Sequence, residues 1–186
     1  MNIPLGRNIG NALEVKEAVD FFAGKYDKRL YDLCVYLSAL MISTAKNISF
    51  RKAKELTLNL IQNGHAKTKF YQWIKNQGGD ITKLKDKAKK LTVVSPKDGY
   101  INKIDAMKLA QLVFDLGAGR VKKTDKIDYA AGVVLNHQLG EKVKKGDVLG
   151  FIYYNKKIEN MDKLFIDSFK IEKKKKRQKN IIIKTI

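Results

Sequence analysis

Cysteine, proline and arginine are scarce in this sequence of 186 residues, which contains one Cys, two Pro and five Arg. The single cysteine, Cys34, cannot form an internal disulfide or a metal cluster by itself, so a disulfide scaffold and a zinc module are excluded. No apolar run reaches the roughly 18 to 20 residues that cross a bilayer, and the first residues lack the charged and apolar regions of a signal peptide. We therefore expect a cytoplasmic protein without a membrane-spanning segment.

Positive charge, in contrast, is abundant. The 38 basic residues outnumber the 19 acidic ones and give a formal net charge of +19. Such a charge is typical of proteins that bind nucleic acid or acidic membranes, but arginine, which binds phosphates through its planar fork, contributes only five of the basic residues. Two interpretations stay open: lysine enrichment by an AT-rich coding sequence, which argues against a nucleic-acid partner, and a genuine surface for polyanions. Residues 170–184 are the most basic, with eight basic residues and one acidic (8 − 1 = +7), and are interpreted as a solvated tail.

The first 80 residues show helical periodicity only. One helix is predicted to begin at the N-cap Asn11 and to end at Gly24, and three more are predicted over residues 28–45, 49–63 and 66–77. The second of these helices carries a continuous apolar stripe, which consists of Leu30, Leu33, Cys34, Leu37, Leu40 and Met41. Cys34 is interpreted as a small buried hydrophobe, because no flanking His or Arg would lower the pKa of its thiol.

From Leu91 onward the pattern changes to short strands and turns. Strands are predicted over residues 91–95, 100–104, 132–135 and 148–153, and helices over residues 109–116 and 161–169. The turn Pro96–Gly99 has the residues expected between two paired strands. We therefore predict a helical part over residues 1–90, an α+β domain over residues 91–166 and a Lys-rich tail over residues 167–186.

Candidate catalytic groups are few. His65 and His137 lie far apart, with no Ser, Cys or carboxylate at catalytic spacing, so both are interpreted as surface residues. The segment Gly117–Arg120 could cradle an anion, but it lacks the Lys-Ser/Thr pair of a phosphate-binding loop, and a glycine-rich helix end is favoured.

A more informative segment runs from Leu5 to Glu17, where a glycine-containing turn leads into a helix N-terminus. The unpaired N–H groups at such a position commonly face a ligand. Glu14 and Glu17 lie three residues apart, so one carboxylate can support the helix cap while the other is available to a cation that loop carbonyls also hold. The alternative is that both carboxylates only interact with the helix dipole.

Six motifs in a fixed order make the sequence recognisable. They are PLGRNIGNALEVKEAV at residues 4–19 and the segments 76–80, 95–101, 116–120, 125–128 and 140–149. Together they closely resemble the C-terminal part of the pyrimidine-nucleoside phosphorylases, which include thymidine phosphorylase. The resemblance covers about residues 1 to 166.

This resemblance implies a homodimeric cytoplasmic enzyme of pyrimidine salvage, which splits a pyrimidine nucleoside with phosphate into the free base and (deoxy)ribose 1-phosphate, without an organic cofactor. It implies an α/β with α+β fold: a helical remainder of the family's large α/β domain, followed by a C-terminal α+β barrel-sandwich (hammerhead) domain. We expect the chain to be the C-terminal portion of such an enzyme, from a truncated or split gene or a misplaced start. The alternative is a non-enzymatic hammerhead module that binds a polyanion through its lysines.

In the family, the groups that bind phosphate and base belong to the N-terminal half, so the resemblance implies no catalytic or substrate-binding residue in this chain. We therefore expect the chain alone to be inactive, unless a separate N-terminal chain complements it. The one family site that reaches this segment is a potassium site. Its ligands here would be the main-chain carbonyls of Leu5 and Asn8 and the carboxylate of Glu17, as a half-site whose other ligands lie elsewhere. Carbonyl and carboxylate oxygens suit a hard cation.

Overall fold

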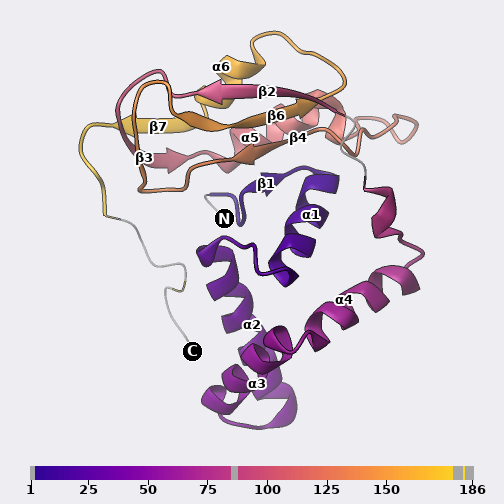
Figure 1. Ribbon diagram of the computed structural model, residues 1–186. Helices are drawn as coiled ribbons and strands as arrows, with labels where there is room; N and C mark the ends of the chain where they lie inside the picture. The colour runs from indigo at the N-terminus through magenta and orange to yellow at the C-terminus, as the bar shows by residue number, and fades with distance from the viewer. Residues whose placement is uncertain (1–2, 85–87, 178–181, 183–186) are drawn as a thin grey trace. The chain divides into compact units, whose positions relative to one another are not determined.

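The computed structural model describes residues 3–84, 88–177 and 182. These residues form two compact units, a β-rich unit made of residues 3–17 and 88–177 and a helical unit made of residues 18–84 (Figure 1). The boundary between residues 17 and 18 falls inside helix α1 (Asn11–Phe22).

The β-rich unit contains two antiparallel sheets. The four-stranded sheet has the order β1-β4-β6-β2 and consists of β1 (Asn8–Ile9), β4 (Gly132–Leu135), β6 (Val148–Tyr154) and β2 (Lys89–Val94). The three-stranded sheet has the order β5-β3-β7 and consists of β5 (Lys142–Val143), β3 (Gly99–Ile104) and β7 (Phe169–Glu172). Figure 1 shows these strands together with two helices, α5 (Ala106–Val113) and α6 (Met161–Ile166).

One hydrophobic core joins both sheets and both helices of this unit. Seventeen buried residues belong to it, and the largest fully buried side chain is that of Phe165 on α6. The strands supply alternate residues, as a sheet with one buried face requires: Val133 and Leu135 of β4 are buried while Val134 between them is half-buried. The mixed helix and sheet content agrees with the predicted α+β domain.

The turn over Pro96–Gly99 does not join two paired strands as predicted. β2 pairs with β6 and β3 pairs with β5 and β7, so the chain passes from one sheet to the other at this turn. A bulge lies between Val93 and Val94, before the last pair of the ladder. Ser95 then donates its N–H to the Asp147 carbonyl (2.8 Å), and its own carbonyl accepts from the Gly146 N–H (2.9 Å). The turn residues were thus predicted correctly, but the partner strands were not.

The end of helix α5 confirms that Gly117–Arg120 closes a helix. The helix begins at the N-cap Asp105, whose carboxylate accepts from the Lys108 N–H, and it continues into a π-helical turn at Phe114–Ala118. Gly117 has φ 103°, a left-handed conformation that favours glycine and ends a helix.

Two segment limits differ from the sequence prediction. The last helix ends at Ile166, and residues 169–172, expected in the helix end and the tail, form β7 because Phe169 and Ile171 point into the core while Lys170 and Glu172 face outward. The expectation that no strand precedes residue 80 is also wrong. β1 pairs with β4, and residues 3–17 therefore belong to the β-rich unit rather than to the helical part.

The helical unit consists of the end of α1 and three further helices. They are α2 (Lys28–Lys46), α3 (Phe50–Gln62) and α4 (His65–Asn76), followed by a single 3-10 turn at Ile81–Lys83. The carboxylate of Asp27 and the hydroxyl of Ser49 cap α2 and α3 by accepting main-chain N–H groups. α2 and α3 pack closely because fully buried alanines, Ala39 and Ala53, lie on the two helices.

A second apolar face of α2 remains exposed. Leu37, Leu40 and Met41 are exposed to 46%, 39% and 72%, whereas Leu30 and Leu33 are half-buried. The predicted apolar stripe is therefore present, but only its C-terminal part, with Leu37, Leu40 and Met41, is exposed. No single helix among the described residues is long and apolar enough to span a membrane; α2 and α3 meet that length and composition only as a pair bent by 119°.

Candidate functional site

The loop that precedes α1 holds the residues of the predicted cation site. Gly10 has φ 138°, and a Cβ at this position would lie 2.6 Å from the Ala131 carbonyl oxygen, so only glycine fits. The Gly10 N–H donates to the carboxylate of Glu14 (3.2 Å), while the side-chain amide of Asn11 donates to the Ala118 carbonyl (2.9 Å). Asn11 is thus the first helical residue rather than the N-cap, and Glu14 supports the helix start as predicted.

Glu17 lies one turn further along α1, and its carboxylate points back to the loop. One oxygen, Oε1, accepts the main-chain N–H of Arg7 at 2.7 Å. A Cβ at position 6 would overlap this carboxylate, so the absence of a side chain at Gly6 gives Glu17 the space that it occupies. Of the two predicted roles, Glu14 therefore has the capping one, and Glu17 faces the segment between Leu5 and Asn8.

Leu5 and Asn8 flank the part of the loop that Glu17 contacts. Asn8 is paired with Val134 in the four-stranded sheet, and its side-chain amide donates to the Leu13 carbonyl of α1 at 2.8 Å. Leu5 is half-buried in the loop. The predicted donors are main-chain carbonyls and one carboxylate, and Gly6 lets that carboxylate lie against the loop. Because all of these donors are oxygen atoms, their chemistry fits a hard monovalent cation.

The described residues contain no cluster of side chains suited to a metal site of several carboxylates or of His and Cys. Over residues 3–84 and 88–177, no three His, Cys, Asp or Glu side chains are grouped so that they could share a metal ion.

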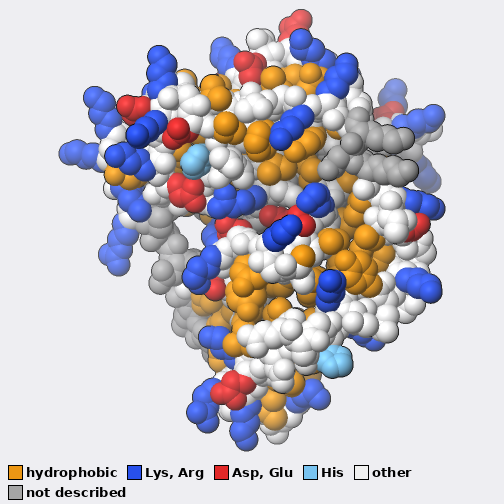
Figure 2. All heavy atoms as spheres, in the orientation of Figure 1, with side chains coloured by type: hydrophobic (Ala, Val, Ile, Leu, Met, Phe, Trp, Pro, Cys, Tyr) orange, Lys and Arg blue, Asp and Glu red, His pale blue; other side chains and the backbone are white. Residues whose placement is uncertain are grey.

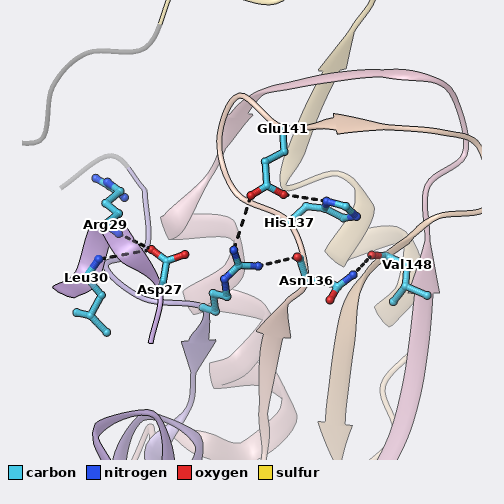
Figure 3. Close-up of polar contacts among 8 residues, drawn as sticks. Asp27, Arg29, Leu30, Asn136, His137, Glu141 and Val148 are labelled. Carbon is cyan, nitrogen blue, oxygen red and sulfur yellow. Dashed lines mark hydrogen bonds and ion pairs between the residues drawn. The ribbon is translucent and has the colours of Figure 1, made fainter. Parts of the chain in front are cut away.

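Arg7 connects this loop to the segment that follows β4. Figure 3 shows Asn136, His137 and Glu141 in that segment. The guanidinium of Arg7 donates from Nη1 to the Asn136 carbonyl (2.6 Å) and lies 3.7 Å from the Glu141 carboxylate through Nη2. The main-chain carbonyl of Arg7 accepts the Leu135 N–H at 2.8 Å. Glu141 also contacts His137, whose Nδ1 lies 3.0 Å from Oε2.

The interpretation of His137 as a surface residue needs correction. Its side chain is only 20% exposed, and it belongs to the Arg7–Glu141 cluster. The spacing of His137 and Glu141, four residues apart, was the signal available in the sequence, but nothing there indicated that Arg7 would join them. His65, in contrast, is exposed at the start of α4, and its main-chain N–H donates to the Asn63 side chain.

Cys34 has the properties of a structural thiol. It is half-buried on α2, and burial raises the pKa of its thiol. A raised pKa keeps the thiol protonated near neutral pH, where the thiolate would be the reactive form. The interpretation of Cys34 as a small buried hydrophobe is therefore confirmed only in part, because the residue is half-buried rather than buried.

One lysine in β7 and one just after it are paired with an acidic residue. Glu172 contacts Lys170 (3.3 Å) and Lys176 (3.1 Å), and it accepts a hydrogen bond from Asn102 at 2.8 Å. Hydrogen bonds from Asn102, Lys176 and Lys170 lower the pKa of Glu172 from 4.5 to about 2. On the face drawn in Figure 2, lysines and arginines are scattered among acidic side chains rather than gathered in one patch.

Comparison with known proteins relates the chain to one family. Residues 100–172 match the pyrimidine nucleoside phosphorylase C-terminal domain. Three curated proteins named pyrimidine-nucleoside phosphorylase, from Staphylococcus aureus strains USA300, NCTC 8325 and COL, are each 39% identical to the chain over 163 residues. The match covers 84% of this chain and 38% of each relative, in its C-terminal portion, so the chain spans about two fifths of the length of these relatives.

Proposed function

We propose that this chain, which is related to the C-terminal portion of pyrimidine-nucleoside phosphorylases, supplies that portion of an enzyme that cleaves pyrimidine nucleosides with inorganic phosphate. The observation that supports this proposal is the 39% identity along 84% of the chain. The matched region of 163 residues is longer than either unit, so it extends over both the helical and the β-rich unit. The products would be a free pyrimidine base and (deoxy)ribose 1-phosphate, and the enzyme would work as a cytoplasmic homodimer in pyrimidine salvage.

The α+β domain would serve as the scaffold of this portion rather than as its chemical centre. Its two sheets would form the barrel-sandwich arrangement of the family's C-terminal domain. The helical unit would belong to the large α/β domain, whose remaining part would cover the exposed face of α2 formed by Leu37, Leu40 and Met41. Covering apolar area of this kind contributes about 25 cal/mol for each Å² removed from water.

A potassium ion would bind at the loop before α1. The main-chain carbonyls of Leu5 and Asn8 and the carboxylate of Glu17 would be ligands from this chain, and the other ligands would come from the rest of the enzyme. Two observations support the site: the Glu17 carboxylate points back to this loop, and the missing side chain at Gly6 lets it lie against the loop main chain. When bound, the ion would supply a fixed positive charge that holds the loop and its neighbouring segments in place.

A fusion protein tests the proposed function. The C-terminal portion of a Staphylococcus aureus relative is replaced by this chain, and release of uracil from uridine and of thymine from thymidine is measured with and without phosphate. We expect phosphate-dependent release by the fusion. The chain alone should give none, because it would lack the groups that hold phosphate and nucleoside in one cleft, an effect that can contribute about 7 to 11 kcal/mol to catalysis.

Two controls make the result specific. The same fusion with Phe165→Ala, which removes the fully buried ring of α6, should lose activity, and Arg120→Met at an exposed position should keep it. A fusion that folds, with intact circular dichroism and cooperative melting, yet cleaves neither nucleoside would contradict the proposal. Such a result would leave the non-enzymatic hammerhead module as the better account.

A further inference from the structure

We propose that Arg7 is a positioning residue for the loop that holds the proposed cation site. Its guanidinium contacts Asn136 and Glu141 and thereby fixes the loop main chain between the two proposed ligand carbonyls, those of Leu5 and Asn8. The inference rests on the proposed cation site and names the residue that organises it. It is independent of catalysis, because Arg7 is assigned no contact with substrate.

Arg7 is restrained at its main chain as well as at its side chain. Its N–H donates to Glu17 (2.7 Å), and its carbonyl accepts from Leu135 (2.8 Å). Its guanidinium donates to the Asn136 carbonyl (2.6 Å) and faces the Glu141 carboxylate (3.7 Å). A single residue therefore connects the loop to α1 on one side and to the end of β4 on the other.

These contacts fix two successive peptide planes. Because a peptide unit is planar, the hydrogen bond of the Arg7 N–H also orients the Gly6 carbonyl, and the bond to the Arg7 carbonyl also orients the Asn8 N–H. The two planes determine φ and ψ of Arg7. The proposed ligand carbonyls of Leu5 and Asn8 lie immediately before and after this fixed pair of planes.

The loop needs such an external restraint because residue 6 is a glycine. Gly6 cannot carry a side chain beside Glu17, and glycine has more backbone freedom than any other residue. Arg7 compensates for this freedom from the next position. Its planar fork contacts the Asn136 carbonyl through Nη1 and faces the Glu141 carboxylate through Nη2, whereas a lysine has one compact ammonium in place of these two separate nitrogens.

Hydrogen exchange on the full 186-residue chain measures this restraint directly. The amides of residue 7 and Leu135 are compared in wild type, Arg7→Met, Arg7→Lys and Glu141→Gln, with Arg120→Met as the matched control at an exposed site of the same unit. We expect exchange at both amides to be at least about tenfold faster in Arg7→Met, since each bond to a charged group contributes on that scale. Arg7→Lys should recover part of the protection, and Glu141→Gln should lose less than Arg7→Met.

A cation titration connects the restraint to the proposed site. The melting temperature of the Staphylococcus aureus fusion that carries each variant is measured in KCl and in choline chloride at equal ionic strength, because the fusion would supply the ligands that this chain lacks. We expect potassium to raise the melting temperature of wild type and of Arg120→Met more than choline does. In Arg7→Met, the KCl concentration that gives half of this rise should be at least about tenfold higher, in proportion to the lost protection from exchange. Arg7→Lys should give an intermediate midpoint.

The outcomes separate this inference from the proposed function. If wild type gains stability from KCl and Arg7→Met has the same midpoint and the same exchange as Arg120→Met, the role of Arg7 is overturned while the cation site stands. If wild type shows no potassium-specific gain, the cation site fails and the inference fails with it. If Arg7→Met does not fold, the Glu141→Gln and Arg7→Lys variants are used to test the role of Arg7. The inference would be overturned if both variants had the same amide exchange rates and the same KCl midpoint as wild type.

Discussion

The β-rich unit and the helical unit bury their apolar residues in different ways. In the former, two sheets and two helices enclose one core of seventeen buried residues. In the described helical unit the buried apolar residues are Phe21, Val35, Ala39 and Ala53, and α2 exposes a second apolar face. Since each fully buried large apolar side chain contributes roughly 1.5 to 3 kcal/mol, the enclosed core should be the more stable of the two. The difference indicates that apolar residues alone do not stabilise a segment, because the segment also needs a second layer of secondary structure to pack against.

Limited proteolysis should show the largest contrast between the units. We expect trypsin to cut first within residues 18–84, because local opening is easiest where few apolar contacts are buried. Residues 88–177 should resist. The peptide that contains β1 should stay bound to this fragment after the cut, since it pairs with β4 and since Arg7 contacts Asn136. Size-exclusion chromatography followed by mass spectrometry would detect the two pieces together.

The result that would contradict this comparison is equally specific. A chain that resists trypsin throughout and melts in one cooperative transition would mean that the helices are stable without a further layer. Release of the β1 peptide upon cutting would mean that the pairing with β4 is weaker than the hydrogen bonds indicate.

A matched pair of leucines compares the two units at one position each. Leu112 on α5 is 2% exposed, and Leu37 on α2 is 46% exposed. We expect Leu112→Ala to lower the free energy of unfolding by about 2 to 5 kcal/mol, because it leaves a cavity in an enclosed core. Leu37→Ala should change it by less than about 1 kcal/mol. Urea denaturation of both variants measures the difference, and equal losses would show that α2 is as well packed as α5.

Acidification should act on the β-rich unit through Glu172. Its pKa falls from 4.5 to about 2 in the folded chain, so the carboxylate stabilises the fold fully above its unfolded pKa, and this contribution is lost as the pH falls from about 5 toward 2. We expect Glu172→Gln to flatten the decline of melting temperature over that range. The effect should be small, because this carboxylate is accessible to solvent. Wild type and variant with parallel curves would show that the pairs with Lys170 and Lys176 do not form in solution.

Thiol labelling should give the smallest effect and reports on the helical unit. Burial raises the pKa of Cys34, so its thiolate fraction at pH 7 is reduced. We expect a thiol-specific disulfide reagent to react with Cys34 more slowly in the folded chain than in urea, and to accelerate as the pH rises. A folded-state rate equal to that in urea would show that α2 opens freely.

The sequence predicted the elements that local patterns define. The apolar stripe over residues 28–45 predicted α2 to within one residue, and the spacing of Glu14 and Glu17 allowed one carboxylate to support the helix start, a role that Glu14 has. Both predictions depend on residues a few positions apart, where helical geometry alone decides which side chains are neighbours.

The features that the sequence did not predict depend on distant partners. β1 has two residues and is a strand only because β4 lies beside it. β7 was not predicted because the lysines that follow it made the segment resemble a solvated tail, and its register is set by pairing with β3. Arg7 and Glu141 are 134 residues apart (141 − 7 = 134), and no pattern within one sequence relates such positions.

The pairing of β1 with β4 also determines the order in which the chain can fold during its synthesis. Asn8 pairs with Val134, 126 residues later (134 − 8 = 126), and the whole helical unit is made between them. At about 5 to 20 residues per second, the ribosome produces β4 roughly 6 to 25 s after β1. During this interval α2, α3 and α4 can form, since helices need only local contacts. The loop before α1 therefore docks only after β4 has been made, so its docking is among the last steps of folding although the loop is made before the helical unit.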